Sequence, residues 1–199
     1  MRLFVAVWPD GATVEALAEL LLPPEPTPGV RWITVSDWHV TLSFLGSVPD
    51  EECEGLVQAL ASAAAACRPA TARAGPATQL LGRAVLCLPV EGLDEIAEAV
   101  LAATAAFSRS PEPDRAFFGH LTLARAAGRR ALPREVAGAP ASAQWPVDTF
   151  RLVRSTTGPQ GSIYETQAVF ALGGPGPSQD EHVFGYTVRD DRLPDTPPP

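Results

Sequence analysis

Two short segments of the chain carry the same pattern of chemically active residues. The sequence reads HVTL at residues 39–42 and HLTL at residues 120–123. If each segment is a strand, its side chains alternate between the two faces, so the His and the Thr share one face and the apolar residues share the other. The chain has 3 His in all, and two of them occupy equivalent positions. This repetition indicates that the two segments serve one chemical task.

The chemistry that needs two such segments is in-line displacement at a phosphorus atom. One imidazole takes a proton from the attacking water while the other gives a proton to the leaving ribose oxygen. Histidine can fill both roles because its ordinary pKa lies close to neutral pH. A Thr hydroxyl on the same face can donate to a phosphoryl oxygen as negative charge builds up. The sequence therefore predicts His39 and His120 as catalytic residues and Thr41 and Thr122 as phosphate ligands, with no metal and no cofactor.

Arg125 is a further candidate for binding the phosphate. It follows His120 by five positions, so simple alternation places it on the face opposite that histidine. Its long side chain can still curl round the end of the strand and reach the phosphate. A surface ion pair is the alternative interpretation of this arginine.

Aromatic residues near the two motifs are candidates for stacking on a base. Tyr164 and Trp38 are the ones that we consider for this role. Alternation along the first motif puts Ser43 on the face of His39 and Phe44 in the core, so we expect Phe44 to pack rather than to bind substrate.

The charge of the chain limits the kind of partner that it binds. The formal net charge is −8, and every cationic side chain is Arg. Residues 109–154 contain eight Arg against four acidic residues, a local charge of +4, so the remainder carries −12. A local group of arginines in an acidic protein suits a small anionic group better than a long duplex. A merely solvated Arg-rich loop is the alternative.

Other side chains give no sign of a metal site or of a membrane segment. The three cysteines (Cys53, Cys67 and Cys87) have no metal-ligand spacing, and we expect buried reduced thiols and a cytoplasmic protein. A metal site made of all three histidines, including His182, lacks a carboxylate to orient the ligands. No apolar run reaches the length of about 18 residues that a membrane span needs.

Periodicity along the chain predicts an α+β fold with two similar halves. Residues 1–172 hold the regular elements, and residues 173–199 form a Pro/Gly-rich acidic tail, in which residues 182–188 alone are apolar enough to dock on the body. Helices are predicted at 14–22, at 51–66 after Asp50 as N-cap, and at 93–107. Strands are predicted at 3–8, 30–33, 37–44, 71–74, 84–90, 119–125, 147–153 and 163–172, with loops at 108–115 and 126–144.

The paired motifs resemble those of the two-histidine (2H) phosphoesterases. The similarity is greatest to the bacterial RNA 2′,3′-cyclic phosphodiesterases, also called 2′-5′ RNA ligase-like proteins. It covers about residues 1–172 and includes MRLFVAV at the start, VRW at 30–32, DWH at 37–39, FLG at 44–46, HLTLAR at 120–125 and FRLV at 150–153. Two departures stand out: Gly119 replaces the Pro that usually precedes the second His, and residues 158–164 read GPQGSIY where relatives often have Gly-Pro-x-Tyr.

The resemblance implies a fold, an activity and a set of roles. The fold is bilobal, with two pseudo-symmetric, mostly antiparallel sheet-and-helix lobes around a central cleft lined by both motifs. The activity is hydrolysis of 2′,3′-cyclic phosphate ends of RNA to 2′-phosphomonoesters, with reversible 2′-5′ ligation in some members. In that scheme His120 activates water and His39 protonates the leaving ribose oxygen.

Two other functions stay open at this point. The same site can act on a small nucleotide, such as a 2′-5′ oligonucleotide or a cyclic ADP-ribose derivative, and the net acidity favours this mildly. A binding module for nucleotides or RNA ends that does not turn over its ligand is a different class, although the presence of both His39 and His120 counts against it. We expect a monomer in each case.

Overall fold

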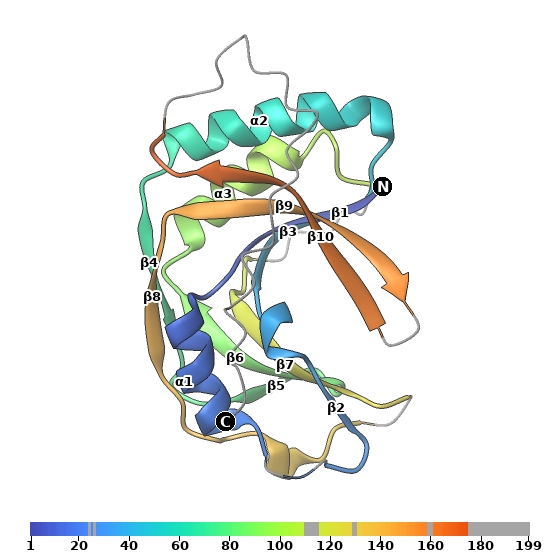
Figure 1. Ribbon diagram of the computed structural model, residues 1–199, viewed down its shortest axis with the longest axis vertical. Helices are drawn as coiled ribbons and strands as arrows, with labels where there is room; N and C mark the ends of the chain where they lie inside the picture. The colour runs from blue at the N-terminus through green and yellow to red at the C-terminus, as the bar shows by residue number, and fades with distance from the viewer. Residues whose placement is uncertain (24, 26, 110–115, 129–130, 159–160, 175–199) are drawn as a thin grey trace, which may run out of the picture.

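Ten strands form one curled sheet in which every pairing is antiparallel (Figure 1). The computed structural model describes residues 1–23, 25, 27–109, 116–128, 131–158 and 161–174. The strand order is β10-β9-β1-β3-β7-β6-β4-β8, with β2 paired to β7 and β5 paired to β6. The predicted α+β class is confirmed. The predictions for residues 175–199, including the docking of 182–188, lie outside the described residues.

The elements follow the chain in this order. The strands are β1 (Arg2–Val7), β2 (Val30–Trp32), β3 (Val40–Ser47), β4 (Ala70–Ala74), β5 (Gln79–Leu81), β6 (Val85–Glu91), β7 (His120–Ala126), β8 (Ala143–Val147), β9 (Thr149–Gly158) and β10 (Gly161–Ala171). The helices are α1 (Gly11–Leu21), α2 (Cys53–Ala66) and α3 (Asp94–Thr104), and the short 3-10 turns are η1 (Val35–Asp37), η2 (Asp50–Glu52) and η3 (Arg134–Val136).

The two lobes are interleaved in the chain rather than consecutive. One lobe combines β1 and β3 with β9 and β10, and α2 and α3 pack together against it (Figure 1). The other combines β2 with β4 to β8, and α1 packs against β8. The lobes meet where β3 pairs with β7 at Val40 and Leu121. The C-terminal strands thus return to the lobe in which the chain begins.

The ends of the helices are set by different devices. The side chain of Asp10 accepts a hydrogen bond from the backbone N–H of Thr13 at 2.7 Å and caps α1. The prediction that Asp50 caps α2 is wrong, because the 3-10 turn η2 intervenes and α2 begins at Cys53 without a side-chain cap. The Asp50 carboxylate lies 3.6 Å from the N-terminal ammonium group instead.

Helix α3 buries one face against the sheet. Ile96, Ala97, Val100 and Thr104 are buried, whereas Leu101 is exposed. The Thr104 hydroxyl lies 3.0 Å from the hydroxyl of Ser43 on β3. This contact ties α3 to the strand that carries the first motif.

Strand predictions failed mainly in the second lobe. Strand β5 lies between the predicted strands 71–74 and 84–90, where we predicted no strand, and the predicted single strand 147–153 is two strands, β8 and β9. Pro146 obscured β8, because proline within a run argues against a strand in the interior of a sheet. Strand β8 stands at the end of the strand order, where a missing backbone donor is tolerated.

The sheet carries apolar residues on both faces, but unequally. The large core lies under the helices and includes Leu3, Val5 and Val7 of β1. On the other face Phe4, Ala6 and Val153 form a small separate cluster, with the half-buried Trp8 and Tyr164 packed against it. We call this second surface the histidine face, because both motifs direct their His and Thr toward it.

Candidate active site

His39 is held at the junction between η1 and β3. The buried Trp38 anchors this junction in the core, and its indole N–H donates to the carbonyl oxygen of Ile33 at 3.2 Å. The next side chain, His39, turns to the opposite face, where its Nδ1 lies 2.7 Å from the carbonyl oxygen of Asp37. Because a carbonyl can only accept, this Nδ1 carries a proton and Nε2 is left for a substrate. The predicted stacking role of Trp38 is wrong, since the ring is fully buried.

His120 is held by the same device on β7. Its Nδ1 lies 2.8 Å from the carbonyl oxygen of Phe118, again two residues upstream. Gly119 between them is buried, and its carbonyl accepts from the N–H of Val90 at 2.8 Å. A Cβ on Gly119 would clash with the Val90 carbonyl oxygen. Gly119 thus allows the chain to approach Val90 closely, directly after the Phe118 carbonyl that accepts from His120 Nδ1.

The pairing of β3 with β7 brings the two motifs together. Val40 is paired with Leu121, and the antiparallel direction of the two strands brings the flanking His39 and Thr41 toward Thr122 and His120 respectively. The apolar pair points into the core, where both side chains are buried. The four predicted polar residues therefore lie near one another on the histidine face, on either side of the Val40–Leu121 pair.

A β-bulge interrupts each strand at the end of its motif. Leu42 has no partner in the pairing of β3 with β1, and Leu123 has none in the pairing of β7 with β6. The fourth residue of each motif is therefore the extra residue of the bulge. The alternation reverses beyond that point. Our placement of Ser43 on the histidine face is wrong, because it is buried on the core side.

The same reversal moves Phe44 and Arg125 onto the histidine face. Phe44 is 38% exposed and stacks on Phe4 at 5.8 Å between ring centroids, which contradicts the prediction that it packs in the core. Arg125 is exposed, and our placement of it opposite His120 is wrong as well. The arginine lies close enough to His39 for its charge to act on that imidazole. The bulge thus places Arg125 on the face of His120, whereas we expected its side chain to reach that face only by curling round the end of the strand.

Aromatic rings enclose His39. The ring centroids of Phe4, Trp8 and Tyr164 lie 5.1, 5.0 and 5.3 Å from that of the imidazole. The pKa of His39 is lowered to about 4, mainly by burial among these rings and in smaller part by the nearby positive charges of His120 and Arg125. The hydrogen bond to the Asp37 carbonyl raises the pKa, but by less than burial lowers it. His39 is therefore neutral at pH 7 in the ligand-free protein.

His120 has a more open environment than His39. Phe118 stacks on it with 5.4 Å between centroids and 22° between planes, and Phe118 is itself 42% exposed. No other ring contact to His120 occurs within the described residues.

The thiol nearest the motifs in the sheet is not suited to nucleophilic chemistry. Cys87 on β6 is the cross-strand partner of Thr122 and is completely buried. Burial raises the pKa of its thiol to about 11, so the thiolate is scarce at neutral pH. The motif histidines and threonines remain the groups that can act on a bound phosphate.

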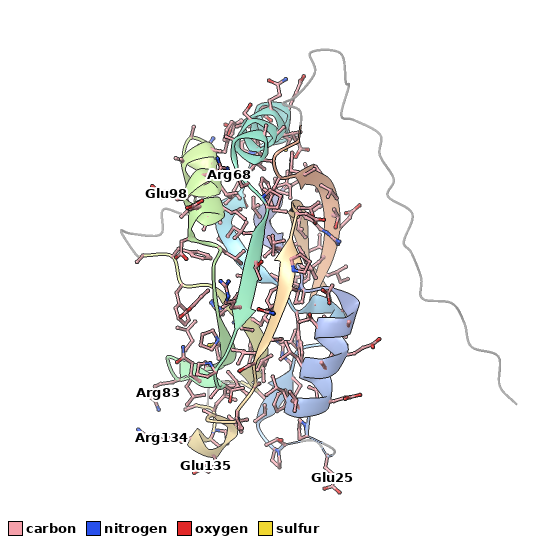
Figure 2. All side chains as sticks on the ribbon, turned by 90° about the vertical axis from the view of Figure 1, so that its left-hand side faces the viewer. Glu25, Arg68, Arg83, Glu98, Arg134 and Glu135 are labelled. Carbon is pink, nitrogen blue, oxygen red and sulfur yellow. The ribbon has the colours of Figure 1, made fainter. Side chains whose placement is uncertain are left out.

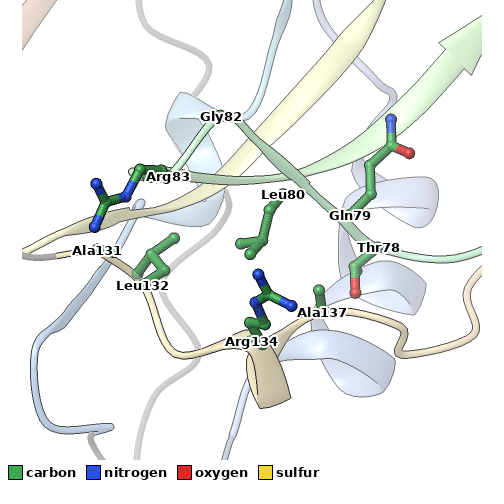
Figure 3. A pocket seen from close by; sticks show the side chains of 9 residues that line it. All are labelled: Thr78, Gln79, Leu80, Gly82, Arg83, Ala131, Leu132, Arg134 and Ala137. Atoms are coloured by element: carbon green, nitrogen blue, oxygen red, sulfur yellow. The ribbon is translucent and has the colours of Figure 1, made fainter.

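One hollow lined by described residues lies away from the motifs. It has a volume of about 610 Å³ and lies between β5 and η3, where Arg134 extends toward Leu80 while Arg83 and Gln79 point outward (Figure 3). Arg83, Arg134 and Glu135 gather at one end of the molecule (Figure 2). Neither His39 nor His120 lines this hollow, so its size does not mark it as the candidate active site.

The part of the chain that the structure describes contains neither a cluster of metal ligands nor a membrane-spanning helix. No group of three or more His, Cys, Asp or Glu is arranged to hold a metal ion there. No helix among the described residues is long and apolar enough to cross a membrane. His182 lies outside the described residues.

Several residues of the histidine face were not predicted from the sequence. Trp8, Phe4 and Arg151 lie on the histidine face, and Arg151 is placed over the Trp8 ring with its guanidinium carbon 5.2 Å from the centroid. A signal was present for β1, because alternation along residues 3–8 places Phe4, Ala6 and Trp8 on one face. No comparable signal pointed to Arg151, whose position depends on the pairing of β1 with β9.

Comparison with known proteins agrees with this architecture. The model of the LigT-like phosphoesterase family matches residues 7–77. An RNA 2′,3′-cyclic phosphodiesterase from Thermus thermophilus is 30% identical over 188 residues, which cover 87% of this chain and 91% of the relative. The chain belongs to the LigT-like family of 2H phosphoesterases.

Solved structures show the same fold. The crystal structure of TT0787 of Thermus thermophilus matches with a TM-score of 0.74 and 30% identity, covering 87% of this chain and 99% of that one. The crystal structure of E. coli LigT complexed with 3′-AMP matches with a TM-score of 0.66 and 26% identity, covering 86% of this chain and 97% of that one.

Proposed function

We propose that this protein hydrolyses 2′,3′-cyclic phosphate ends of RNA to 2′-phosphomonoesters, with His39 and His120 as its proton-transferring pair and without a metal. The observation that carries the proposal is the cross-strand group of His39, Thr122, Thr41 and His120, in which both Nδ1 atoms face backbone carbonyls. Two Nε2 atoms are thereby free on one surface. The name of the Thermus relative and the 3′-AMP bound to E. coli LigT support the substrate class.

The reaction needs two proton transfers at opposite sides of the phosphorus. Water attacks the phosphorus in line with the bond to ribose O3′, and Nε2 of His120 takes the water proton. The P–O3′ bond breaks, and Nε2 of His39 gives its proton to O3′, which leaves the phosphate on O2′. The hydroxyls of Thr41 and Thr122 donate to the phosphoryl oxygens as charge develops. If a 5′-hydroxyl of RNA takes the place of water, the same step forms a 2′-5′ linkage.

The acid role of His39 requires that the substrate raise its pKa. Moving the pKa from about 4 to neutral pH takes three units, or about 4 kcal/mol. A phosphate anion at a distance on the order of 4 Å supplies about 4 kcal/mol at the effective dielectric constant of a partly buried site. The anion also offsets the charges of His120 and Arg125 that lower this pKa. Binding of the substrate at pH 7 should therefore be accompanied by proton uptake on His39.

A substrate panel tests the activity. The full-length protein, kept in excess EDTA, should open a dinucleotide that ends in a 2′,3′-cyclic phosphate, and phosphorus NMR should show a 2′-phosphomonoester as the product. Preference for a 2′-5′-linked dinucleotide would instead assign the site to small nucleotides. Tight binding with no turnover would make the protein a binding module. Activity that EDTA removes and a divalent metal restores would refute the metal-free mechanism.

The assignment of acid and base has its own test. A substrate whose leaving group needs no protonation should rescue His39→Ala and leave His120→Ala inactive. Calorimetry of 3′-AMP binding at pH 7, in two buffers of different ionisation enthalpy, should show proton uptake that His39→Ala abolishes. Rescue of His120→Ala alone, or binding without proton uptake, would reverse the two roles.

A further inference from the structure

Arg31 lies beside Arg125 on the histidine face. The two residues are cross-strand partners in the pairing of β2 with β7, and cross-strand partners project to the same side of a sheet. Their neighbours Trp32 and Ala124 form the next pair and pack into the core. Both arginines are exposed.

Neither guanidinium is neutralised by an acidic side chain that the structure describes. Ion pairs within the described residues join Met1 to Asp50, Arg109 to Glu52 and Arg154 to Glu165. Two like charges directly opposite each other in a sheet repel. An anion placed between them removes this cost and can accept hydrogen bonds from both planar groups.

Arg31 also connects the second lobe with the first. A methyl group on the Cα of Gly161 would lie 3.1 Å from Nη1 of Arg31, so the guanidinium lies directly against the hairpin of β9 and β10. Gly161 has a φ of 141°, a conformation that side chains rarely adopt. The backbone at this point thus leaves room for the arginine.

The arginine pair lies beside the group of histidines and threonines. Arg125 follows Thr122 on β7 by three residues, of which Leu123 is bulged, so roughly two strand rises of about 3.3 Å separate the two positions. This spacing is similar to the distance between neighbouring phosphates along one strand of a nucleic acid.

We infer that Arg31 and Arg125 together bind the phosphate on the 5′ side of the terminal nucleotide, so that the substrate is the end of an oligonucleotide rather than a free cyclic mononucleotide. The inference rests on the proposed function, because it takes the histidine group as the site of the cyclic phosphate. Arg31 is then a residue that determines specificity, and it takes no part in the proton transfers.

Three substrates separate this role from a purely structural one. They are adenosine 2′,3′-cyclic phosphate, the same nucleotide with a 5′-phosphate, and the dinucleotide ApA with a 2′,3′-cyclic phosphate end. Arg31→Ala should raise KM about tenfold for the two substrates that carry the extra phosphate. For the mononucleotide without it, KM and kcat should change much less. Arg31→Lys should recover part of the loss, because it keeps the charge but not the planar fork.

Salt dependence and a control arginine complete the test. The slope of log KM against log salt for the dinucleotide should become shallower by about 0.7 in Arg31→Ala, the value for one phosphate contact to a single strand. Arg154→Ala, which removes a half-buried arginine paired with Glu165, should leave all three substrates unaffected. Equal losses of Arg31→Ala on all three substrates would show that Arg31 only holds the hairpin, and would overturn the inference while the proposed function stands. Failure of the wild-type protein to open any of the three would refute the proposed function itself.

Discussion

The two halves of the candidate site share a backbone design but differ in what surrounds the imidazole. In each half a carbonyl two residues upstream accepts from Nδ1, and a bulge comes directly after the Thr. His39 then lies among Phe4, Trp8 and Tyr164, whereas His120 contacts only Phe118 among the described rings. The fifth residue after the His is Phe44 in the first half and Arg125 in the second. Because more rings surround His39 and Arg125 lies on the second strand, we call the two halves the aromatic half and the cationic half.

This difference shows how a pseudo-symmetric site can treat its two ends differently. Similar hydrogen bonds orient both imidazoles, but the surroundings of His39 lower its pKa. The aromatic half contributes most to this shift, because burial is its largest cause. The cationic half presents the guanidinium groups of Arg125 and of its cross-strand partner Arg31. Substitutions in each half can test whether this asymmetry has functional consequences.

Removal of either imidazole should have the largest effect. His39→Ala and His120→Ala should each lower kcat on the cyclic dinucleotide by about 10²–10⁴-fold, the usual contribution of one general acid or base. Because both histidines act in one step, the double variant should fall far short of the product of the two single losses. Circular dichroism and melting temperature serve as controls for folding. Single variants with nearly wild-type rates would end the catalytic interpretation of the pair.

The two threonines test whether the halves contribute equally to the phosphate. Thr41→Ala and Thr122→Ala should each lower kcat by no more than about 10²–10³-fold, the loss seen when one donor to a developing oxyanion is removed. The cross-strand register makes their positions equivalent, so we expect the two losses to be similar. Thr→Ser at either position should retain most of the activity. A loss confined to one threonine would show that the phosphate contacts one half only.

Much of this site was predictable from local patterns, but its surroundings were not. The His and Thr positions follow from alternation over three residues, which no distant contact disturbs. Phe44 and Arg125 were misplaced because a bulge adds one residue to the strand and exchanges the two faces beyond it. Nothing local at Leu42 or Leu123 indicates a bulge, since both are ordinary strand residues.

The fold shows the same limit at a larger scale. The ends of elements with strong periodicity, such as β1 and α3, were predicted to within a few residues of their observed positions. The order of strands was not, because the return of β9 and β10 to the first lobe depends on long-range pairing. Arg31 and Arg151 gain their positions only through that pairing. Sequence reasoning therefore identified the reacting groups and missed most of the residues that surround them.

Gly119 should matter more than its size suggests, because a Cβ there meets the Val90 carbonyl oxygen. In Gly119→Ala the backbone must shift, and the Phe118 carbonyl that orients His120 shifts with it. We expect kcat to fall by about 10–100-fold, in line with the sensitivity of catalysis to small displacements, with a smaller change in KM. Gly55→Ala on α2, where the nearest atom is an ordinary contact at 3.5 Å, is the control and should behave like the wild type. Full activity of Gly119→Ala would show that Phe118 does not need this approach.

The smallest and most specific effect concerns the pKa of His39, which NMR titration of the imidazole can follow. Trp8→Ala admits water to the ring, and because desolvation is the main cause of the low value, the pKa should rise from about 4 toward its ordinary value. Arg125→Gln removes a positive charge that disfavours the imidazolium, so in this variant too the pKa of His39 should rise, but by less than in Trp8→Ala. The ordering of these two changes follows from the order of their causes.

The same shift links His39 to stability. The unfolded chain binds a proton on this residue from about pH 6.5 downward, whereas the folded protein does so only near pH 4. Stability from this residue is therefore complete above about pH 6.5 and is lost as the pH falls toward 4. Urea unfolding between pH 7 and pH 4 should show a shallower loss in Trp8→Ala than in the wild type, whatever the stability of the variant at pH 7. A titration of His39 that neither Trp8→Ala nor Arg125→Gln moves would mean that the aromatic and cationic surroundings do not set its charge, and the contrast between the two halves would then have no electrostatic basis.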